Sequence, residues 1–216
     1  MGFVSSILDV LFPPKCVFCR KILDGGSCLC QNCIELLPYT VEGGKHEGES
    51  YTCCISALYY SGVVRKSILR YKFGGASAYA EVYGKILADC ISSNLKEKYD
   101  IITWVPLSSR RRRSRGYDQS MLLALATALE LEDVAVETLK KPVDIKAQSE
   151  LTAKEERLEN ISGAFEAVNT ELFEGKCVLL IDDIITTGAT LSECAKALLS
   201  EGAQKVFCAT LAKASR

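Results

Sequence analysis

Histidine, tryptophan, methionine and net charge are all scarce in this chain. Its 216 residues include one His, one Trp and two Met, and 26 Lys and Arg nearly balance 27 Asp and Glu, for a formal charge of −1 at pH 7. No global field therefore draws the protein to nucleic acid or to a membrane surface, and any such attraction must be local. The only histidine, His46, lies in a stretch rich in Gly and Glu. We expect it to be exposed and without function, so chemistry by a His base is disfavoured.

Long apolar runs and secretion signals are missing as well. No run approaches the roughly 18 apolar residues that a membrane helix needs. Residues Gly2 to Phe12 predict a short amphipathic helix ended by Pro13-Pro14, but they lack the basic n-region and the small-residue cleavage site of a signal peptide. The composition, 48% hydrophobic and 25% charged, is ordinary for a globular protein. We expect no membrane insertion, one substantial α/β core with a small appendage, and a cytoplasmic location.

Cysteine, in contrast, is abundant, with eleven residues. Four of them form two C-x-x-C pairs separated by ten residues, Cys16/Cys19 and Cys30/Cys33. Four thiolates in this arrangement can close a tetrahedral zinc site, and metal binding would supply much of the folding free energy of so small a segment. A redox pair or two disulfides are the alternatives. Zinc is favoured because a redox pair normally starts a helix after a strand, whereas the first pair here follows a double proline.

The other cysteines do not repeat this pattern. Cys28 is a spare thiol beside the second pair, and Cys53 and Cys54 are adjacent, so we expect the latter two to be core thiols. Residues Val41 to Ser50 look like a flexible linker. The chain is thus expected to divide into residues 1–50, with the helix, the two knuckles and the linker, and residues 51–216, with the α/β core.

The most informative stretch is Val178 to Thr190. Four apolar residues run into Asp182 and Asp183 and then into a loop, Thr186 to Thr190, that has one glycine and three hydroxyls. A continuous apolar run is typical of a strand buried in a parallel sheet, and such sheets bind ligands beyond the carboxyl ends of their strands. The loop opens onto a predicted helix, whose free N–H groups favour an anion. An ordinary strand and turn would explain neither the acids nor the hydroxyls, so we predict a phosphate cradle. The G-x-x-x-x-G-K-[ST] and G-x-G-x-x-G signatures are both absent.

A second buried strand, Ile101 to Pro106, leads into a basic segment. Five of the six residues from Arg110 to Arg115 are arginines. A solvated charge run is one interpretation. Its position after a strand, however, predicts that this segment shares a sheet edge with Asp182 and Asp183, where guanidinium groups could clamp pyrophosphate or a nucleic acid backbone.

The rest of the chain alternates between predicted strands, helices and loops. These are a β-rich stretch from Thr52 to Tyr60, helices at Gly62–Tyr71, Ala78–Leu95 and Gln119–Leu129, a strand at Val134–Leu139, a mobile loop at Lys140–Ala153, a helix at Ala153–Glu159, and, after the phosphate loop, a helix that stops at Gly202 and a strand at Lys205–Leu211.

Residues Val178 to Thr190 resemble the phosphoribosyl-pyrophosphate (PRPP) signature of type I phosphoribosyltransferases, and the chain from Cys16 to about Ala212 resembles the ComF (competence protein F) family. The resemblance implies an α/β fold of the type I phosphoribosyltransferase kind, a mostly parallel sheet flanked by helices, with a small N-terminal zinc module of four cysteines. It implies that the two acids hold the ribose hydroxyls and that the loop holds the 5′-phosphate. The substrate-binding residues expected from the residues and the resemblance together are Asp182, Asp183, Thr186, Thr187, Gly188, Ala189, Thr190, Ser108, Ser109, Arg110, Arg115 and Lys72.

The chemistry that the resemblance implies is displacement of pyrophosphate from the ribose by a nitrogen nucleophile, with Mg²⁺ carried on PRPP. Thr186 stands where purine-salvage relatives have an Asp as proton acceptor, so 6-oxopurine salvage is disfavoured and no catalytic residue is assigned. The family usually has Phe and Asn where this chain has Tyr117 and Asp118. Three functions are open: a phosphoribosyltransferase, a regulator that senses PRPP or another nucleotide without turnover, and a DNA-uptake accessory protein whose arginines contact single-stranded DNA.

Overall fold

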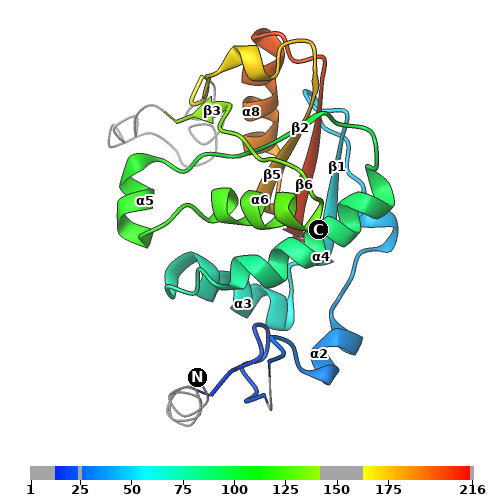
Figure 1. The fold of residues 1–216 in the computed structure, drawn as a ribbon, viewed down its shortest axis with the longest axis vertical. Coiled ribbons are helices and arrows are strands. Elements are labelled where there is room, and N and C mark those ends of the chain that lie inside the picture. The colour runs from blue at the N-terminus through cyan, green and yellow to red at the C-terminus, as the bar shows by residue number, and fades with distance from the viewer. Residues whose placement is uncertain (1–12, 24–25, 142–162, 215–216) are drawn as a thin grey trace.

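The computed structural model describes residues 13–23, 26–141 and 163–214 (Figure 1). The predicted helices at Gly2–Phe12 and Ala153–Glu159, and most of the predicted loop between Lys140 and Ala153, lie outside these residues. In the described ranges, no helix is long and apolar enough to cross a membrane.

The core is a four-stranded sheet in the order β1-β6-β5-β2, and each of its three pairings is parallel. Its strands are β1 (Cys53–Tyr59), β2 (Ile101–Trp104), β5 (Cys177–Ile185) and β6 (Lys205–Lys213). The apolar runs that predicted buried strands therefore lie in the sheet, with β5 and β6 at its centre. In the β5–β6 register Asp182 lies opposite Thr210.

Helices cover both faces of the sheet. Alternate residues of β5 belong to different cores: Leu179 and Ile181 pack with α4 (Tyr79–Asn94) and α6 (Gln119–Glu130), whereas Leu180 packs with α8 (Ala189–Ser200). Because side chains of a strand alternate between faces, α4 and α6 lie on one side and α8 on the other. This sandwich explains why β5 shows no polar alternation.

Two further helices follow strands at the carboxyl edge of the sheet. They are α3 (Gly62–Phe73), which follows β1, and α5 (Ser109–Arg115), which follows β2. Figure 1 shows the N-terminal knuckles and α2 (Gln31–Leu36) next to α3, at the end of the molecule opposite to α8.

Two predictions about extended segments are wrong. The strand expected at Val134–Leu139 is not continuous: Ala135 makes one bridge to Ile102, and only β3 (Leu139–Lys140) pairs further, antiparallel to β4 (Glu166–Ala167). The segment expected as a flexible linker at Val41–Ser50 instead packs along the sheet. It begins with the 3₁₀-helix η1 (Val41–Gly44), and His46 then exchanges two backbone hydrogen bonds with Cys54 of β1. A second 3₁₀-helix, η2 (Thr170–Leu172), precedes β5.

Candidate functional site

The phosphate-type loop lies where β5 ends and α8 begins. Strand β5 ends at Ile185, and α8 starts at Ala189 after Gly188, which has a φ of 82° and is buried. That φ is in the left-handed region, which favours glycine. Thr187 Oγ1 accepts a hydrogen bond of 3.4 Å from the N–H of Ala189. A small hollow is lined by Asp182 and by residues 184–191, so the first acid and the loop share one surface.

The two acids have different surroundings. Asp182 Oδ1 accepts hydrogen bonds from Ser120 Oγ at 2.7 Å and from the N–H of Asp183 at 2.8 Å. Burial, followed by the charge of Asp183, raises the pKa of Asp182 to about 7, against the opposing charge of Lys72. Asp183 is 6% exposed and its Oδ1 lies 2.9 Å from Lys72 Nζ. One acid is thus held by a hydroxyl and the other by a cation.

Lys72 is among the expected substrate-binding residues, with a solvated surface lysine as the alternative interpretation, and the structure places its ammonium group at the acid pair. The residue lies in the last turn of α3 and its side chain is 20% exposed. An ammonium group at this place neutralises part of the charge of two adjacent carboxylates, which would otherwise repel each other. The position is also within the candidate site, so an anionic ligand would meet a lysine there.

The basic segment that follows β2 forms a short helix, α5. The buried Ser108 caps its N-terminus, since Ser108 Oγ accepts from the N–H of Arg111 at 3.5 Å, and Gly116 ends it with a φ of 82°. Residues 109–113 are exposed. Within the described part of the chain, neither Ser109 nor Arg110 hydrogen-bonds to the phosphate-type loop.

Arg115 is the member of this segment that faces the rest of the site. Its Nη1 donates a hydrogen bond of 2.8 Å to Gln119 Oε1, and its Cζ lies 4.8 Å from the ring centroid of Phe73, the residue after Lys72. The structure therefore connects Arg115 to the end of α3, while the arginines at 110–113 form a solvated face.

Asp118 has a structural role that the sequence did not single out. It is 4% exposed, its Oδ2 accepts from the N–H of Leu107 at 2.8 Å, and its Oδ1 accepts from the N–H of Met121 at 3.1 Å as the cap of α6. Its charge is thus used on backbone N–H groups rather than left facing the anion site. An acid just before an apolar helical stripe is a recognisable cap signal.

The expectation that His46 is exposed is wrong. His46 is half-buried, and its Nδ1 lies 3.0 Å from the hydroxyl of Tyr51, which is 5% exposed. A Cβ added at Gly188 would lie 2.7 Å from this hydroxyl and 3.6 Å from His46 Cε1. Both rings therefore lie against the phosphate-type loop. No short-range pattern could have shown it, because more than 130 positions separate Tyr51 from Gly188.

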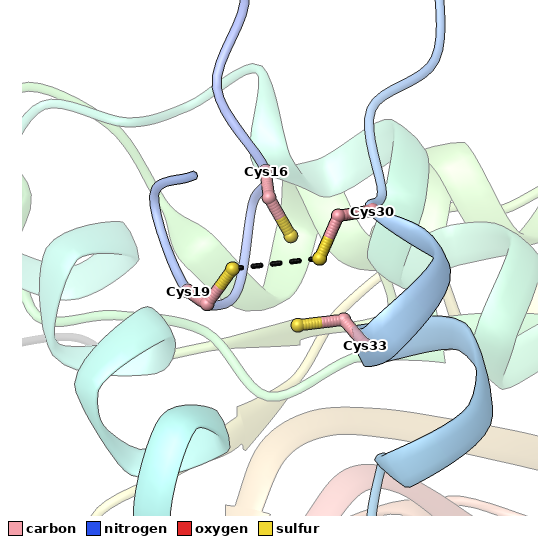
Figure 2. A group of neighbouring side chains, drawn as sticks. All are labelled: Cys16, Cys19, Cys30 and Cys33. Carbon is pink, nitrogen blue, oxygen red and sulfur yellow. Dashed lines mark hydrogen bonds between the residues drawn. The ribbon is translucent and has the colours of Figure 1, made fainter. Parts of the chain in front are cut away.

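The four cysteines of the C-x-x-C pairs converge. Their Sγ atoms all lie within 4.8 Å of one another, and Cys19 Sγ and Cys30 Sγ are 3.5 Å apart. Figure 2 shows the four side chains pointing toward one another. Zinc–thiolate bonds of about 2.3 Å in a tetrahedron put the sulfurs slightly under 4 Å apart, so this set fits Zn²⁺. Two separate disulfides or a redox pair would not require all four thiols to point at one centre.

The remaining cysteines lie outside this cluster. Cys28 is exposed, whereas Cys54, Cys194 and Cys208 are buried among apolar neighbours. Burial raises the pKa of the Cys54 thiol to about 12. Cys54, Cys194 and Cys208 are core thiols, as predicted for Cys54, whereas Cys53, for which the same was predicted, is only half-buried.

Comparisons with known proteins match both regions. A family model described as "Phosphoribosyl transferase domain" matches residues 118–216, and one described as "Double zinc ribbon domain" matches residues 7–44. The predicted fold class, a type I phosphoribosyltransferase-like α/β fold with an N-terminal zinc module, is confirmed.

Relatives resemble the chain over different shares of their length. Competence protein F of Haemophilus influenzae is 29% identical over 223 residues, which cover 93% of this chain and 97% of that protein. Competence protein ComFC of Bacillus subtilis is 28% identical over 152 residues, which cover 68% of this chain and 58% of that relative, less than two thirds of its length. Among solved structures, glutamine PRPP amidotransferase from B. subtilis aligns with a TM-score of 0.47 at 21% identity, over 66% of this chain and 30% of that one.

Proposed function

The chain belongs to the ComF (competence protein F) family, and from this membership we propose that it binds PRPP or a related phosphoribosyl ligand, with Mg²⁺ carried on that ligand. The observation that supports the proposal is the meeting of Asp182, Asp183 and residues 186–190 at the carboxyl end of one central strand. Acids suited to ribose hydroxyls and a helix N-terminus suited to a phosphate lie side by side there.

Each part of the proposed site has a distinct task. The carboxylates accept hydrogen bonds from the ribose hydroxyls, and the backbone N–H groups and hydroxyls of the loop bind the 5′-phosphate. Lys72, which pairs with Asp183, and Arg115, which lies over the ring of Phe73, supply positive charge for the pyrophosphate or its metal complex. Transfer of the phosphoribosyl group to a nitrogen acceptor would then proceed by positioning and electrostatics, with no protein base, because the hydroxyl of Thr186 is a poor one.

A second function is favoured by the exposed arginines of α5. Relatives bear the names competence protein and, at 36% identity over 52% of this chain, "DNA utilization protein YhgH" in Salmonella typhi. Four consecutive exposed guanidinium groups, Arg110 to Arg113, suit the backbone of a single nucleic acid strand. We propose this role as an alternative that is compatible with ligand binding at the acid pair.

A calorimetric titration with Mg-PRPP tests the first proposal. We expect binding by the wild type and by the charge-matched control Asp89→Asn/Asp133→Asn, whose altered residues are exposed. Binding should be lost in Asp182→Asn/Asp183→Asn. Equal affinity in all three proteins would contradict the site.

Two further measurements separate the functions. Release of pyrophosphate from PRPP in the presence of an amine or base acceptor would establish transfer. Salt-dependent binding of single-stranded DNA that disappears in the quadruple variant with Ala at 110–113 would support the DNA-binding role, whether or not the protein also binds PRPP.

A further inference from the structure

Helix α3 joins the zinc module to the candidate ligand site. Val17 and Phe18 lie between Cys16 and Cys19 in the first knuckle and are 4% and 1% exposed. Their carbonyls face α3: Arg70 Nη2 donates to Val17 O at 2.8 Å and to Phe18 O at 2.7 Å. Ser67 Oγ also donates to Val17 O at 2.6 Å. The backbone of the knuckle is therefore bonded to one side of this helix.

The other side of the same helical turn carries the site lysine. Lys72 follows Arg70 by two positions, so the two side chains leave the helix in different directions. Between them Tyr71 is fully buried, and its hydroxyl donates to Gln119 O at 2.8 Å. A shift or rotation of this turn that releases Arg70 would therefore also move Lys72 Nζ from its place 2.9 Å from Asp183.

The first knuckle provides the hydrogen-bond acceptors of the Arg70 guanidinium. Within the described residues no carboxylate pairs with Arg70, and its Nε is buried without a partner. The two knuckle carbonyls are thus its main polar contacts. Arg70 is half-buried and its Nε is fully buried, so loss of its two carbonyl acceptors would leave a partly desolvated cation without partners. We therefore expect the end of α3 to rearrange if the knuckle unfolds.

We propose that the first knuckle positions Lys72 in the ligand site through Arg70, so that an intact four-cysteine cluster is required for the Lys72–Asp183 ion pair and for full ligand affinity. Arg70 is a positioning residue in this proposal and touches no ligand. The part that concerns affinity rests on the proposed function, whereas the part that concerns the ion pair does not. The knuckle has little core of its own, so metal binding holds its carbonyls in place.

Amine acylation followed by mass spectrometry tests the ion pair without any ligand. The ratio of modification at Lys72 to that at Lys66, an exposed residue on the same helix, reports whether Lys72 is held. We expect a low ratio in the zinc-loaded wild type and in the control Arg65→Gln. The ratio should rise several-fold in Arg70→Gln that retains its zinc and in wild type treated with a chelator. An intermediate ratio is expected in Arg70→Lys, which keeps the positive charge but not the planar guanidinium group.

Two outcomes would overturn the proposal. One is an unchanged ratio in zinc-retaining Arg70→Gln or in the chelated wild type. The other is a rise that extends to lysines of α4 and α8, such as Lys85 and Lys196, because the knuckle would then hold the whole fold together rather than one side chain.

Titration of the same samples with Mg-PRPP separates this proposal from the one on function. We expect zinc-retaining Arg70→Gln to bind roughly five- to tenfold more weakly than the wild type, within the usual range of coupling between sites. If the modification ratio responds but no sample binds PRPP, the proposed ligand is wrong and the link between knuckle and lysine stands. If PRPP binds equally to all samples, the link to affinity is wrong and the ligand site stands.

Discussion

The buried environment of Asp182 gives this residue a contribution to stability whose pH dependence is opposite to that of most carboxylates. Burial and the neighbouring charge of Asp183 raise the pKa of Asp182 to about 7, from 3.8 for an ordinary aspartate. The folded protein therefore binds this proton more tightly than the unfolded chain does. The stability that Asp182 contributes is complete below about pH 4 and is lost as the pH rises through about 7.

Substitution of Asp182 by Asn removes this titration and keeps the shape of the side chain. In the wild type, Ser120 Oγ and the N–H of Asp183 donate hydrogen bonds to Asp182 Oδ1. The carbonyl oxygen of an Asn side chain can accept both of these hydrogen bonds. The free energy of unfolding changes by at most about 1.4 kcal/mol per pH unit for one proton. Because water reaches part of Asp182, we expect the stability of the Asn variant relative to wild type to increase by roughly 1–2 kcal/mol between pH 5.5 and pH 8.

Urea unfolding of both proteins at four pH values across this range measures the difference. The four-cysteine cluster is common to both, so its own response to acid cancels. Asp133→Asn, an exposed control, should show a difference from wild type that does not vary with pH. A pH-independent difference for Asp182→Asn, or one that falls as the pH rises, would refute the assignment of a buried, charge-crowded carboxyl.

Three further predictions concern the loop, a cap and the metal. Gly188→Ala should lower the free energy of unfolding by roughly 2–3 kcal/mol, because the new Cβ would lie 2.7 Å from the Tyr51 hydroxyl and the alanine backbone would have to keep a φ of 82°. In thermal unfolding, adding Tyr51→Phe should restore part of the lost stability, and no recovery would exclude the contact. Asp118→Ala should lower the free energy of unfolding by about 1–2 kcal/mol because the cap of α6 is lost, whereas Asp118→Asn should keep most of the stability. If urea unfolding showed no loss in Asp118→Ala and PRPP binding became stronger, Asp118 would act as a repulsive charge. Cys33→Ser should lower the zinc content measured by atomic absorption while Cys28→Ser keeps it, and equal metal in the two variants would exclude the four-thiolate assignment.

Local patterns in the sequence were sufficient to predict the central strands and the helix that follows the phosphate-type loop. Strands β5 and β6 with helix α8 follow from an apolar run, a glycine-containing loop and an i, i+3, i+4 stripe, because the forces that shape them act between near neighbours. Two C-x-x-C pairs likewise predict a four-thiolate centre, since the chemistry of the metal dictates the spacing of its ligands. The prediction of a strand at Val134–Leu139 was wrong because an extended segment that packs against the core has the apolar pattern of a strand even when it forms no continuous backbone pairing.

The sequence by itself therefore determined the zinc knuckles, the buried parallel strands and the placing of two acids before an anion-type loop. Only the tertiary structure decided what the acids and the loop contact: Ser120 contacts Asp182, Lys72 contacts Asp183, and the hydroxyl of Tyr51 lies against Gly188. These contacts join residues some 60 to 140 positions apart. They depend on how the helices pack against the edge of the sheet. Many side chains across the whole core set this packing together, so no short-range periodicity in the sequence encodes it.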